Sequence, residues 1–548
     1  MSGETPVRRR RRLRDRVPVR LRHHWKPAAA LGVGLAAMVA FLGDARMSPY
    51  VTSSSSVEAD AITDDVGGTV DLYDASASHT IQLTYQQTDF NKMMKEFKDD
   101  GTKDYIEADL VIDGVYLNDV GIRLKGNSTL SSLRGGARGG PGGGQGMPGA
   151  GQQGAPAGGA SAGATGGGKK TEGAGGAGGP GGAGGMGGMI SYDLSAEKPE
   201  ELPWLVKVDE YVEGRAYQGE REISLRPGSN GDVPLNEALS LKLTDRSGQK
   251  AERYAFTELT VNNRPTATRL MVESPDTDYA ESVGNGNGVA YKARAGSSFE
   301  YKGDDPTDYE TSFKQLNKKG SQDLEPVMKF IKWVDSASDK EFARDLHQHV
   351  DVDSLATYVA LQNLMLNGDD MAGPGKNYVL WYDLDTKKFS VLGWDYNLTF
   401  SGDATAGPED DVGIGGGMMG GGGGAGGAGG AGGADNGQMP EGMPTDMPSG
   451  MPEGMPDGMP GGGGMGGHPL KEKFLDSDAF DDVYKKAYSE LYQKLYGSGT
   501  AATDLKDIAE QARNAGADSK TLDTAVTKLQ KTVTERSAAL AEDKEVTG

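Results

Sequence analysis

Residues 367–400 contain the side chains of this sequence that are best suited to binding a cation together with phosphate. Asp369 and Asp370 lie in a predicted turn, Asn377 opens a predicted strand after a Gly-Pro-Gly turn, and Asp395 ends the next predicted strand. Carboxylates at the ends of adjacent strands can converge on one hard cation, and Mg²⁺ takes oxygen ligands and usually keeps substrate phosphates. The same residues also suit a surface turn with a strand-end cap, because turns favour them for local reasons. This stretch alone leaves both interpretations open.

The elements around this stretch must position its polar side chains. Residues 351–366 are predicted to form a helix, with Asp353 or Ser354 as its N-cap. Its apolar face consists of Leu355, Tyr358, Val359 and Leu366. Two strands are predicted to follow this helix, so the acidic turn lies between a helix and a strand.

Sequence patterns before and after this stretch predict both strands and helices. Alternation indicates a strand over 69–83, and Asp113-Gly114 within 105–127 is typical of a β-hairpin turn. Helices are expected over 89–98, 233–244, 251–254, 324–334 and 340–347, and amphipathic helices over 471–496 and 503–541. Strand-like pieces lie between residues 202 and 274, so the fold class is α+β.

Charge and cysteine content exclude several kinds of protein. The net charge is −22, but residues 1–26 carry ten Lys or Arg against two acids, so the remainder is −30. Such an acidic body argues against nucleic acid as a partner and suits an exported protein or one that holds divalent cations. The absence of cysteine excludes disulfides, thiolate metal sites and cysteine nucleophiles.

The N-terminus has the features of an export signal. An arginine-rich arm precedes the uncharged run 27–43, which is short for a membrane span and long for a signal-peptide core. The arm could instead bind nucleic acid, but its position before an apolar run favours export. Flanking positive charge holds the N-terminus in the cytoplasm. The rest is expected to be extracytoplasmic, either secreted or anchored to the membrane by this single segment.

Composition predicts the domain boundaries. Residues 1–45 form the basic arm with its signal peptide or anchor, and 46–68 form a linker. One domain covers 69–133 and 191–402, interrupted by a Gly-rich insertion at 134–190. A Gly and Met-Pro tract covers 403–468, and residues 469–548 form the C-terminal helices. Both tracts are expected to be disordered, because they have few large apolar side chains to bury.

The Met-Pro repeat in the second tract allows two interpretations. Methionine recurs every four residues from Met439 to Met459. Thioethers select soft metals such as Cu(I), so the repeat could bind copper outside the cell. Alternatively it is a low-complexity loop, which is favoured because only His468 accompanies the methionines and each repeat contains proline.

Several motifs resemble, in order, those of the CotH family of spore-coat protein H kinases. They are VGIRLKGNSTL (120–130), LVKVDEY (205–211), FTELTVNNRPTATRLMVES (256–274), GVAYKAR (288–294), VDSLATYVALQNLMLNGDDMAGPGKNYVLWYD (352–383) and FSVLGWDYNLTF (389–400). The last two are the most specific. The resemblance implies an atypical, two-lobed protein-kinase-like fold with the Gly-rich tracts as insertions.

The resemblance also implies an activity: transfer of the ATP γ-phosphate to Ser or Thr of secreted, cell-surface or spore-envelope proteins. It makes Asp369 the catalytic base and Asp395 the main ligand of Mg²⁺ or Mn²⁺, with Asn377 as a second ligand. Lys207 becomes the phosphate-binding lysine and Glu273 its ion-pair partner. The alternative phosphate contacts are Arg123, Lys125 and Asn127. Phosphoryl transfer needs these groups, because it depends on charge neutralisation and positioning.

Three departures from the family pattern weaken the implied activity. Asn397 stands where the family's Trp-Asp-x-Asp motif has its second acid, although its carbonyl oxygen still allows metal binding. The insertion at 134–190 closely follows the Gly-Asn-Ser motif, and no Gly-x-Gly-x-x-Gly loop stands directly before Lys207. Asp370 adjoins Asp369 and is either an alternative base, a metal ligand or a turn residue. A catalytically weak, pseudokinase-like scaffold for envelope or spore-coat assembly therefore stands as the second hypothesis.

Overall fold

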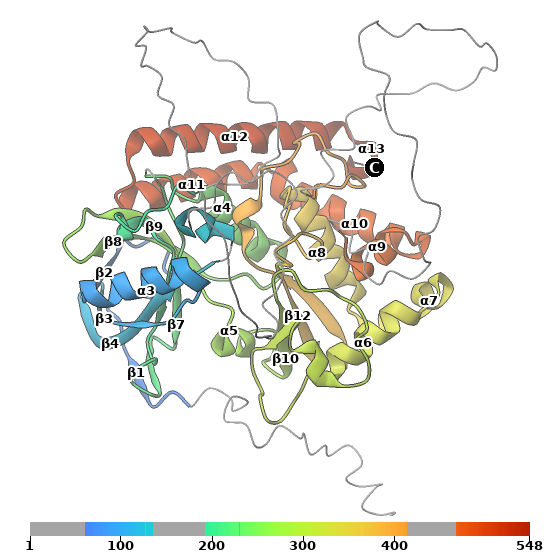
Figure 1. Ribbon diagram of the computed structural model, residues 1–548. Helices are drawn as coiled ribbons and strands as arrows, with labels where there is room; N and C mark the ends of the chain where they lie inside the picture. Colours follow the sequence, from blue (N-terminus) through green and yellow to red (C-terminus); the bar gives the residue numbers. More distant parts are fainter. Residues whose placement is uncertain (1–60, 127, 135–191, 230, 414–466, 548) are drawn as a thin grey trace, which may run out of the picture. The chain divides into compact units, whose positions relative to one another are not determined.

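The computed structural model describes residues 61–126, 128–134, 192–229, 231–413 and 467–547. Ala59–Asn317 and Leu324–Gly548 form one compact unit, which contains every contact reported below. The predicted export segment, Asn127, residues 135–190 of the first tract and the Met-Pro repeat lie outside the described residues. Helices and sheets are both present, which confirms the predicted α+β class (Figure 1).

Seven strands close into a β-barrel in the order β2, β3, β4, β5, β7, β9, β8. Their bounds are β2 His79–Tyr85, β3 Ile106–Ile112, β4 Val115–Leu124, β5 Trp204–Lys207, β7 Glu222–Leu225, β8 Tyr254–Val261 and β9 Ala267–Glu273. The predicted hairpin at Asp113-Gly114 is confirmed, and both residues have positive φ (49° and 83°), as a tight hairpin turn requires. The strand predicted over 69–83 forms only from His79 onward.

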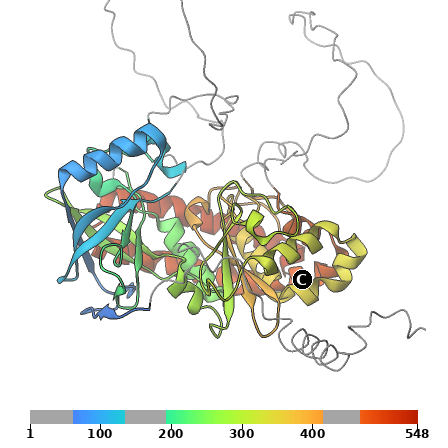
Figure 2. The ribbon, with the colours of Figure 1, turned by 60° about the horizontal axis from the view of Figure 1, so that its bottom comes forward.

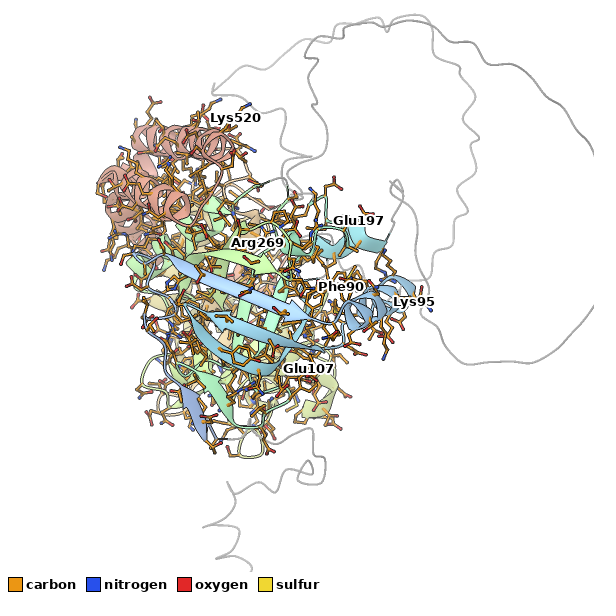
Figure 3. All side chains as sticks on the ribbon, turned by 90° about the vertical axis from the view of Figure 1, so that its left-hand side faces the viewer. Phe90, Lys95, Glu107, Glu197, Arg269 and Lys520 are labelled. Atoms are coloured by element: carbon orange, nitrogen blue, oxygen red, sulfur yellow. The ribbon has the colours of Figure 1, made fainter. Side chains whose placement is uncertain are left out.

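The helix α3 (Gln87–Asp100) packs against the barrel and confirms the helix predicted at 89–98. Its buried side chains Phe90, Met93, Met94 and Phe97 share a core with the inward-facing residues of the strands. Phe90 lies at this contact (Figure 3) and stacks on Tyr85 with ring centroids 5.2 Å apart. Burial of each such side chain contributes about 1.5–3 kcal/mol.

A second, four-stranded sheet has the order β11, β10, β12, β13, and all its neighbouring strands are antiparallel. Its strands are β10 Gly288–Ala293, β11 Phe313–Gln315, β12 Tyr378–Asp383 and β13 Phe389–Gly393. Tyr378 at the start of β12 pairs with Gly393 at the end of β13. The residues just outside this pair, Asn377 and the Trp394-Asp395 dipeptide, therefore lie at the same end of the hairpin.

Three helices lie in sequence between β11 and β12 of this sheet, and the last of them contacts β13 (Figures 1 and 2). They are α6 Glu325–Ser336, α7 Asp339–His349 and α8 Val352–Leu364, as predicted. The N-cap prediction for α8 is wrong. Asp351, not Asp353 or Ser354, caps the helix by accepting the Ser354 backbone N–H at 3.0 Å, because the helix begins at Val352, before both candidate caps.

The helix α4 (Leu235–Ser247) confirms the prediction at 233–244 and leads into β8. The short helix predicted at 251–254 is wrong, since Tyr254 already starts β8 and pairs with Val272 of β9. Sheet pairing overrides the local helical pattern there. Other short elements are β1 Asp64–Val66, β6 Arg215–Tyr217, α5 Thr277–Glu281 and the 3₁₀ turns Ser128–Arg134, Pro199–Glu201, Pro306–Tyr309, Tyr396–Leu398 and Asp478–Phe480.

The C-terminal region is helical, as predicted, but in more pieces. It contains α9 Pro469–Leu475, α10 Asp481–Tyr492, a π-helical turn Gln493–Gly497, α11 Thr500–Asn514, α12 Ser519–Glu542 and α13 Lys544–Thr547. The helices α11 and α12 contact each other and α4, and α10 contacts α8. Within the described parts of the chain, no helix has the length and apolar character needed to cross a bilayer.

Candidate active site

The acidic turn is built around the side chain of Asp369. Its Oδ1 accepts the Gly375 N–H at 2.6 Å, and its Oδ2 accepts the Asn377 Nδ2–H at 3.0 Å. Gly375 must be small here, because a Cβ at that position would lie 2.4 Å from Asp369 Oδ2. The Gly-Pro-Gly turn thus folds back over Asp369 and fixes its carboxylate.

The environment of Asp369 favours its protonated form. Desolvation is the main cause that raises the pKa of Asp369. The hydrogen bond from Gly375 lowers this pKa, and the negative charge of Asp395 raises it. The two carboxylates therefore lie within electrostatic reach of each other. A carboxylate with a raised pKa is suited to accept a proton during a reaction.

Asp395 follows β13 in a left-handed conformation, with φ of 57° and ψ of 66°. Its side chain is 26% exposed, and its Oδ1 lies 3.5 Å from Arg226 Nη1. Arg226 Nη2 also contacts Glu237 Oε1 of α4 at 2.5 Å, and the Glu237 side chain is only 1% exposed. The helix α4 thus reaches Asp395 through a chain of two ion pairs.

The polar residues after Asp395 are held by the same helix. Asn236 Nδ2 donates to the backbone oxygens of Asn397 (2.9 Å) and Thr399 (3.3 Å). The Asn397 side-chain oxygen is buried and has no hydrogen-bond partner among the described residues. An unpaired buried acceptor calls for a partner such as a water molecule or a cation.

Two lysines lie within electrostatic reach of Asp395. Lys125 follows β4 and Lys292 lies in β10; both are partly buried. Desolvation and the neighbouring Arg226 lower the pKa of Lys125 to about 8, and desolvation and Lys125 lower that of Lys292 to about 7. Asp395 opposes both shifts, so it lies within electrostatic reach of each lysine.

Within the described chain, neither lysine ammonium has a hydrogen bond or an ion pair to a protein group. Lys292 Nζ instead lies 3.3 Å from the ring centroid of Trp394, the residue before Asp395. Two desolvated ammonium groups that repel each other provide a site for an anion, because an anion between them removes the repulsion.

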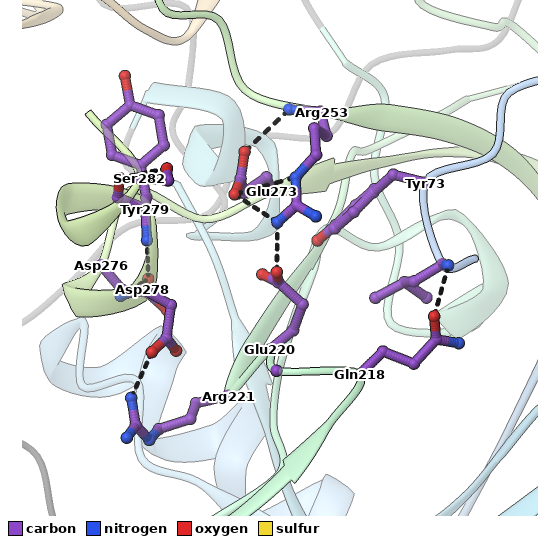
Figure 4. A network of polar contacts seen from close by, with 12 residues as sticks. Tyr73, Gln218, Glu220, Arg221, Arg253, Glu273, Asp276, Asp278, Tyr279 and Ser282 are labelled. Atoms are coloured by element: carbon purple, nitrogen blue, oxygen red, sulfur yellow. Dashed lines mark hydrogen bonds and ion pairs between the residues drawn. The ribbon is translucent and has the colours of Figure 1, made fainter. Parts of the chain in front are cut away.

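Lys207 and Glu273 do not form the predicted ion pair. Lys207 binds Glu210 at 2.7 Å and lies 3.8 Å from Asp209. Glu273 instead binds Arg253, which also contacts Glu220, in the network of Figure 4. The strand order explains the difference: β7 lies between β5 and β9, so the two residues are on strands about 10 Å apart.

Arg123 packs on an aromatic ring, and its charge also lowers the pKa of Lys125. Its guanidinium lies 5.1 Å from the ring centroid of Tyr105, with Lys207 Nζ at 5.8 Å from the same ring. The structure therefore brings together Lys125, Asp369, Asn377, Asp395 and Asn397, and it leaves Lys207, Glu273 and Arg123 in separate contacts.

Sequence reasoning missed Arg226, Glu237 and Lys292. Lys292 lies within the GVAYKAR motif, which offered a signal because a lysine in an otherwise apolar strand is unusual. Arg226 and Glu237 offered none, because an arginine before Pro-Gly and a glutamate in a first helical turn are common local patterns.

The residues present suit a magnesium ion that is also bound by phosphates. The described residues include no group of three or more His, Cys, Asp or Glu side chains arranged to hold a metal. Mg²⁺ does not require such a group, because it is usually bound by one or two carboxylates, waters and substrate phosphates. The Asp395 carboxylate, the unpaired side-chain oxygen of Asn397 and the side-chain amide oxygen of Asn377 match that need.

Comparison with known proteins finds a family and a relative for this chain. The chain is 23% identical over 197 residues to the inner spore coat protein H of Bacillus subtilis (strain 168), covering 35% of this chain and 54% of that protein. It thus spans about half the length of this curated relative. The family described as CotH kinase protein matches residues 193–538, which is more than half of the chain and includes Asp369, Asn377 and Asp395. The chain belongs to the CotH family.

Proposed function

We propose that this protein is an ATP-dependent protein kinase that acts on Ser or Thr hydroxyls of secreted, cell-surface or spore-envelope proteins. The observation that carries the proposal is a pair of lysines, Lys125 and Lys292, that have no hydrogen bond or ion pair among the described residues. Both lie within electrostatic reach of Asp395, whose charge also acts on Asp369. A triphosphate with a divalent cation supplies the charges that such a site lacks. Family membership and the spore-coat relative support the reaction class and the envelope location.

The proposed roles follow from the contacts. Lys125 and Lys292 hold the phosphate oxygens, and Asp395, Asn397 and Asn377 hold Mg²⁺ or Mn²⁺. Asp369 accepts the proton of the substrate hydroxyl as its oxygen bonds to the γ-phosphorus and the bond to ADP breaks. The metal, when bound, neutralises charge on the transferred phosphoryl group. Arg226 and Glu237 connect α4 to Asp395 and orient it.

A kinase-like division into two lobes fits this arrangement. The barrel with α4 corresponds to the smaller lobe, and the four-stranded sheet with its helices corresponds to the larger one. Lys125 comes from the barrel, whereas Lys292, Asp369 and Asp395 come from the second sheet and its flanking turns. Nucleotide bound between these lysines would contact both parts.

Phosphate transfer from radiolabelled ATP tests the proposal. The full-length chain is incubated with Mg²⁺ or Mn²⁺ and co-secreted proteins, and Asp395→Ala is expected to abolish labelling. Asp353→Asn is the matched control, because Asp353 is an exposed carboxylate in the first turn of α8. Lys125→Met and Lys292→Met are expected to raise the KM for ATP, whereas Lys340→Met, an exposed lysine of α7, is not. Label that survives Asp395→Ala refutes the assignment.

The second candidate is a pseudokinase-like scaffold, which the contact between Arg226 and Asp395 favours. A protein cation beside the proposed metal ligand competes with the metal, and Asn397 replaces a second acid. Thermal unfolding separates the two functions. Bound metal–nucleotide at about 100 times its Kd stabilises a protein by about 2.7 kcal/mol. No increase in Tm with any nucleotide or metal would favour the scaffold.

A further inference from the structure

The segment where the second tract ends, residues 467–471, packs directly on the acidic turn, residues 369–376. Lys376 Nζ donates to the carbonyl oxygens of Ala372 (3.2 Å) and Gly467 (3.3 Å). His468 is buried, lies 3.1 Å from the Tyr378 hydroxyl through its Nε2, and packs on Phe299. The start of α9 is thus bound to the turn that carries Asp369.

The shortest of these contacts involves Asp370. Its Oδ2 lies 2.6 Å from Lys471 Nζ, and the two side chains are only 4% and 17% exposed. Its Oδ1 accepts the Ala372 backbone N–H at 2.8 Å. Both oxygens of Asp370 therefore have partners within the protein, and its charge is balanced by a lysine 101 residues later in the chain.

We infer that Lys471 is a positioning residue that holds Asp370 away from the reaction and leaves Asp369 as the acting carboxylate. The inference rests on the proposed kinase function. The ion pair with Lys471 distinguishes Asp370 from Asp369 as the catalytic base, because the two aspartates have the same side chain and differ only in their partners. Asp369 is held by neutral donors, Gly375 N–H and the Asn377 amide, and forms no ion pair with a cation among the described residues. Asp370 is neutralised by a cation.

The same helix supplies a matched control. Lys473 lies two residues after Lys471 in α9, and its Nζ donates to the carbonyl oxygens of Val334 (2.7 Å) and Ala337 (2.8 Å) at the end of α6. Both lysines anchor α9 through short contacts, but only Lys471 reaches the acidic turn. Loss of Lys473 therefore reports on the docking of α9 alone.

The test compares Lys471→Met, Lys471→Arg, Lys473→Met and the double variant Asp370→Asn/Lys471→Met in the full-length chain. Lys471→Met is expected to lower kcat at least about tenfold with the KM for ATP changed by less than about twofold, because the nucleotide contacts remain. Lys471→Arg keeps the cation and retains most of kcat. The double variant removes the unpaired charge and recovers most of kcat, and Lys473→Met keeps wild-type kcat.

Hydrogen exchange of peptides covering residues 366–378, read without nucleotide, gives a second measurement that needs no activity. Exchange is expected to be at least about tenfold faster in Lys471→Met and near wild type in Lys473→Met and in the double variant. If the wild-type protein transfers no phosphate, the proposed kinase function is refuted. The hydrogen-exchange comparison then still decides whether Lys471 orders the turn that carries Asp369 and Asp370.

Three results would overturn the inference. They are a kcat of Lys471→Met within about twofold of wild type, a double variant as slow as Lys471→Met, and an equal loss in Lys473→Met. The last result would make α9 docking, rather than the charge on Asp370, the cause.

Discussion

Glu252 provides the most quantitative prediction. It lies just before β8 and is 2% exposed, and neither carboxyl oxygen is hydrogen-bonded to another residue of the described chain. Desolvation is the main cause that raises its pKa from 4.5 to about 8, against the attraction of Arg226. We expect Glu252→Gln, which is neutral and of the same shape, to stabilise the protein at alkaline pH.

The sign follows from proton binding. Because the folded pKa is above the unfolded one, the folded state holds a proton that the unfolded state has lost between pH 4.5 and about 8. Stability from this group is therefore greatest below pH 4.5 and decreases as the pH rises toward 8. A Gln side chain does not titrate, so the variant lacks this decrease.

The magnitude follows from the same two values. At about 1.36 kcal/mol per pH unit, the interval from 4.5 to about 8 corresponds to a ceiling of about 5 kcal/mol. Between pH 5.5 and pH 8 the expected difference between variant and wild type changes by about 3 kcal/mol at most, and by about 2 kcal/mol if local relaxation admits water.

Urea unfolding at half-unit steps from pH 5.5 to 8.5 measures this difference. Glu341→Gln is the control, because Glu341 is an exposed residue of α7 whose hydrogen bonds to Ser338 lower its pKa below the range studied. A stability difference between Glu252→Gln and wild type that stays constant over this range would refute the reasoning, since it would mean that Glu252 is ionised throughout.

Three other changes have defined outcomes. Gly375→Ala forces Asp369 and Asn377 apart and is expected to lower phosphate transfer about 100-fold, whereas Gly67→Ala, which meets open space, leaves it unchanged in the same assay. Arg536→Leu removes a fully buried guanidinium that donates to Asn363 Oδ1 at 2.7 Å and is expected to cost about 3 kcal/mol in urea unfolding. Ser338→Ala removes the capping box of α7 and should cost about 1 kcal/mol in the same measurement.

Each of these has a result that contradicts it. Equal transfer by the two glycine variants would show that Asp369 does not need its present orientation. An unchanged urea midpoint for Arg536→Leu would mean that water replaces the guanidinium without cost. A loss above about 3 kcal/mol for Ser338→Ala would exceed what one cap supplies and would point to wider disruption of α7.

The sequence by itself determined the constellation at the end of the second sheet. Asp369, Asn377 and Asp395 were found from one stretch of chain, because a short antiparallel hairpin brings the residues before its first strand and after its second strand together. The turn at Asp113-Gly114, most of the helices outside the C-terminal region and the family were also predicted, since they depend on local periodicity, turn chemistry and motif order.

Only the tertiary structure decided the partners of the charged groups. Lys207 and Glu273 looked like an ion pair, but strand order separates them and places Glu273 beside Arg253. The contacts of Asp395 with Arg226 and of Asp370 with Lys471 join residues far apart in the chain. Such pairs follow from how elements pack, and local sequence patterns report a residue's own element but not which distant side chain lies against it.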